Sequence, residues 1–372
     1  TSLNTILYGP PGTGKTYKTK EYAVQIIKNN GEEVLTKDQI EELYESDQIE
    51  FVTFHPSYSY EDFVEGIRPV IQENNVGIAQ FEHHEGIFKK ICRRAFDGLM
   101  KFINEENKDT QHGTEQQGVS IQETNSTPNN KPFDWKLSKL EQRELHNQTR
   151  SLKDNVVKWA KVPKYVLIID EINRGDISKI FGELITLIEP DKRLGCNNKL
   201  TTRLPYTNHL FAIPPNLYIL GTMNTADRSL ALIDIALRRR FDFEEMFPDF
   251  EALLNKPSAY GIDNSVGESP LFKSSISAAS NLNKFLGEDP DIGKDKKIGH
   301  AFFCNLENES DIKIVWKNKI FPLLEEYFYF DRNRLQEKSY GSYTVSNGWN
   351  IRNEGLELFI EQWAKNNATE NI

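Results

Sequence analysis

Residues 5–16 read TILYGPPGTGKT, a short apolar run followed by a Gly/Pro-rich loop that ends in Lys15 and Thr16. A strand before this loop and a helix after it are the context that a triphosphate-binding loop requires. Glycines let backbone N–H groups converge on phosphate oxygens, and the helix adds its positive N-terminal end. We therefore predict a phosphate-binding loop rather than a plain turn, with Lys15 on the β- and γ-phosphates and the Thr16 hydroxyl on Mg²⁺. The predicted ligands are Gly9, Pro10, Pro11, Gly12, Thr13, Gly14, Lys15 and Thr16.

A second motif is the apolar run Tyr165–Ile169, which ends in Asp170 and Glu171. Carboxylates at the C-terminal tip of a buried parallel strand face the ligand crevice of an α/β sheet. We expect Asp170 to hold the hydration shell of Mg²⁺ and Glu171 to polarise the attacking water. The alternative is that either carboxylate caps the next helix.

Two further motifs follow in chain order. Asn224 ends another apolar run, and an amide there can bond both the γ-phosphate and the lytic water. Three arginines, 238–240, form either an exposed basic cluster or an arginine finger, the positive charge that a phosphoryl-transfer site needs. A neighbouring subunit supplies this finger in ring-forming ATPases. Arg239 and Arg240 are the predicted candidates, and the sequence leaves open which of them acts.

The alternation of strand-like and helix-like segments predicts an α/β fold, with a mostly parallel sheet flanked by helices and a helical C-terminal lid domain. The predicted core spans 1–248 and the lid 249–372. Residues 104–135 are rich in Asn, Gln, Thr and Glu and too poor in apolar residues to offset their ordering entropy, so we expect a mobile insertion. The expected strands are 5–8, 49–54, 165–169, 217–222 and 241–244, with a hairpin in 199–213. The expected helices are 15–30, 87–103, 137–160, 177–188 and 230–238.

Composition excludes several classes of protein. The net charge of -10 argues against a surface that grips nucleic acid everywhere, although a local basic stripe stays open. The three cysteines lie far apart, which favours free thiols over a zinc site. No apolar run approaches the roughly 20 residues of a membrane helix, and no leader opens the chain. These features predict a cytoplasmic protein without a membrane partner.

The flanks of these motifs are more specific than a generic phosphate-binding loop and resemble the McrB family. The resemblance spans about residues 4–335 apart from the insertion. It rests on LIIDEINR (167–174), SKIFGEL (178–184), EPDKR (189–193), GTMNTADRSL (221–230), ALRRRF (236–241), HPSYSYEDFVEG (55–66), IGHAFF (298–303) and PLLEEYF (322–328).

This resemblance implies an AAA+ P-loop NTPase that assembles into hexameric rings, prefers GTP and uses Mg²⁺. It implies a McrC-like partner that stimulates hydrolysis and carries the nuclease, with DNA translocation driven by the ring. Asn224 and Asp227 fall in the family's signature loop and would place the lytic water, while Arg228 would contact the nucleotide or a neighbouring subunit.

Two departures and three alternatives accompany the resemblance. The chain has no counterpart of the family's N-terminal domain that reads modified DNA, so DNA specificity is open, and the insertion is unlike compact family members. One alternative is a MoxR-like ATPase that remodels protein complexes, and another is a nucleotide-binding assembly module with little turnover. ATP in place of GTP is the third. His300 stands where some lids carry a phosphate-sensing residue, but packing is the simpler expectation.

Overall fold

The computed structural model of the protein describes residues 2–28, 41–43, 45–70, 80–112, 135–136, 139–226, 235–329 and 355–365. The chain groups into two compact units. The sheet unit comprises Thr1–Leu7, Thr16–Met223 and Leu230–Glu244. The helical unit comprises Tyr8–Lys15, Asn224–Ser229 and Glu245–Ile372. The phosphate-loop residues thus group with the C-terminal helices, and the division at residue 248 stays a prediction.

A five-stranded sheet has the order β2-β5-β8-β1-β9, with β2, β5 and β8 paired in parallel. The predicted strands are confirmed, each to within two residues, and β9 lies at one edge of the sheet. The strands are β1 (Asn4–Gly9), β2 (Ile49–Thr53), β5 (Tyr165–Asp170), β8 (Leu217–Asn224) and β9 (Asp242–Glu245). Because the C-terminal ends of parallel strands meet at one edge, this order brings the tips of β5 and β8 together.

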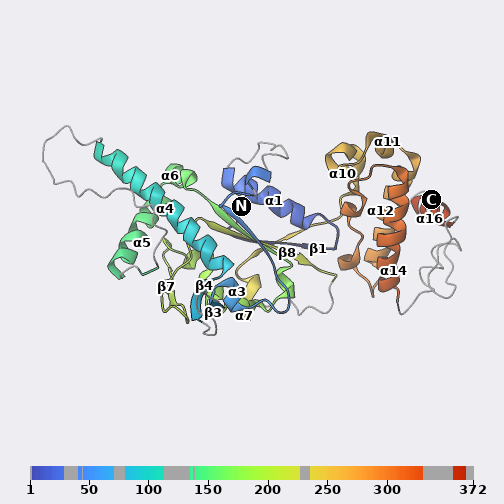
Figure 1. The fold of residues 1–372 in the computed structure, drawn as a ribbon. Coiled ribbons are helices and arrows are strands. Elements are labelled where there is room, and N and C mark those ends of the chain that lie inside the picture. Colours follow the sequence, from blue (N-terminus) through green and yellow to red (C-terminus); the bar gives the residue numbers. More distant parts are fainter. Residues whose placement is uncertain are drawn as a thin grey trace. The chain divides into compact units, whose positions relative to one another are not determined.

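Both faces of the sheet are covered, as the apolar runs predict. The helix α1 (Lys15–Lys28) lies over one face, and α3 (Tyr60–Phe63) and α7 (Ile177–Phe181) lie on the other (Figure 1). In β5, four successive residues, 166–169, are fully buried, which requires cover on both sides because successive side chains alternate between faces. The cluster beneath α1 consists of Ala23, Val24, Ile26, Ile49, Val166, Ile168 and Leu220.

The remaining helices of the sheet unit differ from prediction in extent. α4 runs from Ile87 to His112, nine residues beyond its predicted end, so the first part of the expected insertion is helical. Its extension consists of polar residues that tolerate an exposed helix, and Glu106 there forms an ion pair with Lys158. Residues 113–134 lie outside the described residues. The other helices are α5 (Lys139–Asp154), α6 (Val156–Lys161), α8 (Leu184–Leu187) and α9 (Ile235–Arg238), with short turns η1 (Ile172–Arg174) and η2 (Pro190–Lys192).

Two helices predicted as continuous are each broken by one residue. The predicted helix 137–160 divides at Asn155, whose side chain accepts a hydrogen bond from the Lys158 N–H and caps α6. The predicted helix 177–188 divides at Gly182, whose φ of 52° belongs to the left-handed region. Of the predicted helix 230–238, residues 230–234 lie outside the described residues.

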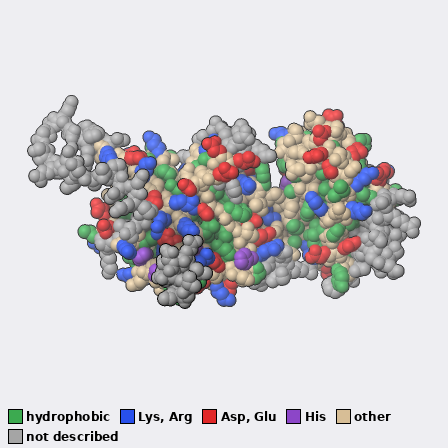
Figure 2. Space-filling model, in the orientation of Figure 1, with side chains coloured by type: hydrophobic (Ala, Val, Ile, Leu, Met, Phe, Trp, Pro, Cys, Tyr) green, Lys and Arg blue, Asp and Glu red, His purple; other side chains and the backbone are tan. Residues whose placement is uncertain are grey.

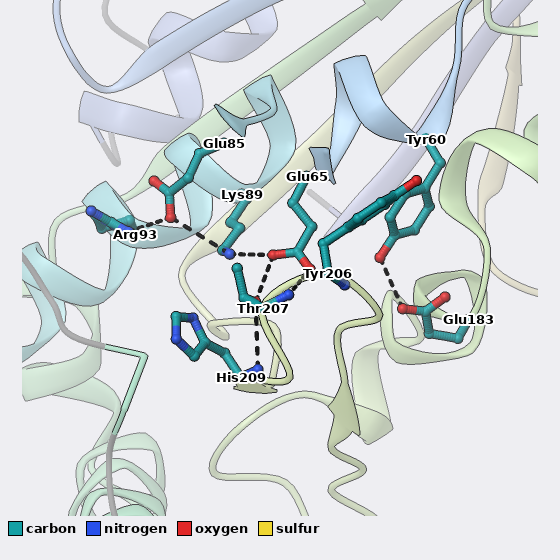
Figure 3. Close-up of polar contacts among 9 residues, drawn as sticks. All are labelled: Tyr60, Glu65, Glu85, Lys89, Arg93, Glu183, Tyr206, Thr207 and His209. Atoms are coloured by element: carbon teal, nitrogen blue, oxygen red, sulfur yellow. Dashed lines mark hydrogen bonds and ion pairs between the residues drawn. The ribbon is translucent and has the colours of Figure 1, made fainter. Parts of the chain in front are cut away.

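Two hairpins extend the sheet unit, and the buried Glu65 carboxylate of the first hairpin contacts both the second hairpin and α4. The hairpin of β3 (Glu65–Val70) and β4 (Gln80–Glu85) was not predicted, whereas that of β6 (Thr202–Arg203) and β7 (Leu210–Phe211) was. Figure 3 shows Glu65 of β3 bonded to Lys89 of α4 at 2.5 Å and to Thr207 in the loop between β6 and β7. The two hairpins are therefore bound to one another and to α4.

The helical unit has its own core. α12 starts at a Ser269 cap and runs through its centre, and the Asn281 amide on this helix donates to the Trp363 carbonyl at 2.8 Å. Trp316 and Trp363 are buried in this core, whereas Trp349 lies outside the described residues. The helices are α10 (Phe250–Asn255), α11 (Asn264–Gly267), α12 (Pro270–Glu288), α13 (Glu309–Val315), α14 (Phe321–Tyr327) and α16 (Gly355–Lys365). The turns are η3 (Pro257–Tyr260), η4 (Lys294–Lys296), η5 (His300–Phe303) and η6 (Trp316–Ile320).

Figure 2 shows acidic and basic side chains interspersed on the visible face of the described residues. Among the helices that the structure describes, none has the length and apolar character that crossing a bilayer would take.

Candidate nucleotide-binding site

The predicted phosphate loop begins at the last residue of β1, Gly9; its residues up to Lys15 belong to the helical unit and Thr16 to the sheet unit. Gly12 and Gly14 have φ angles of 72° and 75°, in the left-handed region that favours glycine. The Thr13 hydroxyl donates to the Pro10 carbonyl at 3.0 Å and closes the loop on itself. This backbone is the kind of concave N–H cradle that binds phosphate.

Lys15 ends this loop and is only 6% exposed. Its ammonium group donates to the Gly9 carbonyl at 3.0 Å and to the Pro10 carbonyl at 2.7 Å. These contacts hold the cation inside the loop, where it can exchange carbonyl oxygens for the oxygens of a bound phosphate. α1 begins at Lys15, so its positive N-terminal end points at the same loop.

Residues of η5 contact the loop from within the helical unit. The Ala301 N–H donates to the Gly12 carbonyl at 2.8 Å, and a Cβ added to Gly12 would lie 2.8 Å from the Phe302 ring. The Nδ1 atom of His300 accepts from the Asp249 N–H at 3.1 Å, so a neutral His300 carries its proton on Nε2. Burial lowers the pKa of His300, which keeps the imidazole neutral at pH 7. The sequence favours a packing role for His300, because only the fold brings this side chain to the loop, where a Cβ on Gly14 would lie 3.9 Å from its Nε2 atom.

The magnesium-binding residues predicted from sequence meet in the sheet unit. Asp170 Oδ1 accepts from the Thr16 hydroxyl at 3.0 Å and from the Thr222 hydroxyl at 2.5 Å. Thr222 also accepts from the Glu171 N–H at 3.1 Å. The register that pairs Ile169 with Gly221 places the next residues of β5 and β8 side by side. Thr222 was not predicted as a site residue. It lies two residues before Asn224 on the same strand, and this position was the one feature of the sequence that pointed to it.

Glu171 leaves β5 in an unusual conformation. Its φ of 53° is left-handed, one of three such non-glycine residues among those the structure describes. A residue of this type in that region costs about 1–3 kcal/mol, and such strain clusters at active sites. Its carboxylate forms an ion pair with Arg174 at 3.3 Å and is largely buried. Asp170 contacts Thr16 and Thr222, whereas Glu171 contacts Arg174, so the two carboxylates have different partners, as two distinct roles would require.

Asn224 is the last residue of β8 and is half-buried. The next residue, Thr225, donates its N–H to the Gly9 carbonyl at 3.1 Å, within the helical unit. Asn224 therefore stands one residue from a backbone contact with the phosphate loop. Asp227 and Arg228 lie outside the described residues.

The two candidate arginines have different environments. The Arg240 side chain forms an ion pair with Glu189 at 3.0 Å and is only 14% exposed, while its carbonyl accepts from the Asn4 amide. Arg239 is exposed. A group that acts on a neighbouring molecule must reach solvent, so Arg239 fits that requirement and Arg240 is committed to contacts within its own chain.

The donor set at Asp170 suits magnesium. Mg²⁺ prefers oxygen ligands, keeps several waters and is commonly held by one or two protein oxygens together with substrate phosphates. Thr16 and Asp170 supply a hydroxyl and a carboxylate oxygen 3.0 Å apart. Within the described ranges no group of three His, Cys, Asp or Glu side chains gathers to hold a metal.

Comparisons with known proteins show which families this chain is similar to. Residues 134–241 match an AAA domain of the dynein-related subfamily, and residues 274–336 match the alpha-helical lid domain of McrB. The chain is 33% identical over 351 residues to the type IV methyl-directed restriction enzyme EcoKMcrB subunit of Escherichia coli K12, covering 90% of this chain. It is 25% identical over 250 residues, 65% of its length, to the type II restriction enzyme BsuMI component YdiS of Bacillus subtilis 168. The chain spans 56% of the length of each relative.

A parallel sheet flanked by helices, a phosphate loop and a helical lid define an AAA+ P-loop protein. The lid match and the similarity along nearly the whole chain narrow this class, and the chain belongs to the McrB family.

Proposed function

We propose that this chain is the nucleoside-triphosphate-hydrolysing motor subunit of a McrBC-like DNA restriction complex. The observation that carries the proposal is the Asp170 carboxylate, which binds the hydroxyl of Thr16 directly after the phosphate loop and that of Thr222 on the neighbouring strand. An AAA+ site needs such a hydroxyl and a strand-end carboxylate side by side for Mg²⁺-dependent phosphoryl transfer.

In the proposed mechanism the loop N–H groups and Lys15 bind the phosphates, and Thr16 and Asp170 would hold Mg²⁺, the latter through water. A bound Mg²⁺ would neutralise charge that develops on the phosphate oxygens. Glu171 accepts the proton of the attacking water, and Asn224 orients that water. Asp227 is proposed to assist Asn224, as the family resemblance implies.

The remaining charge is stabilised in trans. A subunit that exposes Arg239 can present it to the nucleotide of a neighbour, which is the reason to propose a ring, hexameric as in the family. Arg240 is proposed to support this charge stabilisation indirectly, because its own contacts fix the backbone next to Arg239.

The nucleotide and the partners are proposed from the resemblance to the McrB family. GTP is the proposed substrate, a McrC-like nuclease the proposed partner, and DNA the material that the ring moves. The proposed location is the cytoplasm. The proposed division into a core at 1–248 and a lid at 249–372 follows the same family.

The test is phosphate release by the purified chain with GTP and with ATP, each with Mg²⁺ and with excess EDTA. We expect Mg²⁺-dependent release that is faster with GTP, and a larger assembly on sizing with a slowly hydrolysed GTP analogue. An ATP preference would overturn the nucleotide assignment only. A chain that hydrolyses neither nucleotide, alone or with a McrC-like subunit, would overturn the enzyme itself.

A further inference from the structure

A buried polar cluster lies at the start of β1, at the end of the strand opposite the phosphate loop. Asn4 is fully buried and uses its whole amide. Its Nδ2 donates to the Ile188 carbonyl at 2.9 Å and to the Arg240 carbonyl at 2.8 Å. Its Oδ1 accepts from the Arg193 guanidinium at 2.6 Å. One side chain thus joins three segments that are far apart in sequence.

Arg193 is the second member of the cluster and is also fully buried. Besides Asn4, its guanidinium donates to the Ile188 carbonyl at 3.1 Å and to the Leu217 carbonyl at the start of β8. Burial lowers the pKa of Arg193 to about 10, so the group is still charged at pH 7. Burying a charge against carbonyl groups costs free energy that an apolar side chain would not, which points to a role other than stability.

The cluster ends on the arginine segment. Arg240 is held twice, through its carbonyl by Asn4 and through its guanidinium by Glu189. Glu189 follows Ile188, whose carbonyl accepts from both buried side chains. Arg239, one residue before, has no part in these contacts and is exposed. The backbone that carries Arg239 is therefore fixed to β1 and β8, while its side chain extends to solvent.

We infer that Asn4 and Arg193 are positioning residues that hold Arg239 in the direction needed to reach the nucleotide of a neighbouring subunit. This inference rests on the proposed function, since it assumes that Arg239 acts in trans. Displacing a catalytic group by about 1 Å can cost on the order of 100-fold in rate, so losing the Arg240 anchor should lower turnover by about 10- to 100-fold.

The experiment uses Asn4→Leu, which removes all three hydrogen bonds, and Asn4→Asp, which keeps an acceptor for Arg193 but loses the donor to Arg240. Asn216→Leu is the matched control. Asn216 is equally buried in the same unit and its amide also bridges two carbonyls, at 3.0 and 2.8 Å, but it does not touch the arginine segment.

Each variant is assayed alone and mixed with Lys15→Ala, a subunit with an intact arginine segment and a disabled phosphate loop. If Arg239 is misplaced in trans, both Asn4 variants lose turnover alone, keep their affinity for a fluorescent GTP analogue, and recover several-fold in the mixture. Asn216→Leu should behave like the wild type in every assay.

A failure of the positioning role and a failure of the proposed function would give different results. If Arg239→Ala recovers with Lys15→Ala but neither Asn4 variant does, the Asn4 cluster only stabilises the fold and the inference is wrong. If both Asn4 variants and Asn216→Leu lose turnover equally, the inference is wrong as well. If the wild type hydrolyses no nucleotide, the proposed function fails first.

Discussion

The Glu65–Lys89 ion pair gives the most quantitative prediction. Glu65 is 1% exposed and Lys89 is 0% exposed, with 2.5 Å between their charged atoms (Figure 3). Glu65 also accepts from the backbone N–H groups of Tyr206 and Thr207, each at 3.0 Å, and from the Thr207 hydroxyl at 2.8 Å. Lys89 has a second carboxylate, Glu85, only at 3.6 Å. Glu65 therefore has several other hydrogen-bond donors, whereas Lys89 has one other, more distant carboxylate among the described contacts.

Substitution should reveal this inequality. Removing one partner of a buried pair costs about 3–5 kcal/mol, and Glu65→Gln leaves the Lys89 charge buried with only the distant Glu85. Lys89→Met leaves Glu65 with three donors, each worth about 1.5–3 kcal/mol to a charged acceptor, so we expect a loss of about 1–3 kcal/mol. The double variant should cost less than the sum by about 0.5–3 kcal/mol, because the two residues contact directly.

The assay is urea unfolding followed by circular dichroism and tryptophan fluorescence. Arg68→Met is the control on the same hairpin, because the Arg68–Asp62 pair is half-exposed and should be worth about 1 kcal/mol or less. Equal losses for Glu65→Gln and Arg68→Met would refute the reasoning. So would strict additivity of Glu65→Gln and Lys89→Met.

Three further predictions concern the nucleotide site. Gly12→Ala places a Cβ 2.8 Å from the Phe302 ring at a left-handed φ, and should weaken binding of a fluorescent GTP analogue by 10-fold or more, on the order of 1.4 kcal/mol; unchanged affinity would contradict it. Burial lowers the pKa of His300 below its ordinary value of about 6.5, so the unfolded chain binds the extra proton and stability falls as pH drops below about 6.5. In thermal melts at pH 5.5–7.5, His300→Asn should lose less stability at low pH than the wild type. An equal loss in both proteins would show that other titrating groups cause it. Thr222→Val removes a hydrogen bond to Asp170 and should raise the Mg²⁺ concentration for half-maximal turnover, with the melting temperature measured as control; an unchanged Mg²⁺ requirement would exclude this role.

Local patterns predicted the central sheet but not the interruptions of the helices. The apolar run 165–169 could only be a buried strand, because its length and composition allow little else. Gly182 breaks a helix that the spacing of apolar residues predicts as continuous, because its left-handed backbone lies against the Tyr60 ring, a contact made only in the fold. The first hairpin escaped prediction for a similar reason, since its buried Glu65 reads as a surface residue until Lys89 is placed beside it.

Some residues of the candidate site could be predicted from sequence and others could not. The loop from Gly9 to Thr16 and the Asp170–Glu171 pair could be proposed from sequence because their chemistry depends on neighbours in sequence. Thr222 and Asn4 could not be, because each acts through hydrogen bonds to residues more than 50 positions away. The choice between Arg239 and Arg240 also depended on the fold, where Glu189 engages only the second.

The most direct test of the central claim is steady-state phosphate release by Glu171→Gln beside equilibrium binding of a fluorescent GTP analogue. If Glu171 is the base that activates water, turnover falls by about 100- to 10,000-fold while nucleotide affinity stays within a few-fold of the wild type. Undiminished turnover, or parallel loss of binding and turnover, would contradict a hydrolytic site built on Glu171.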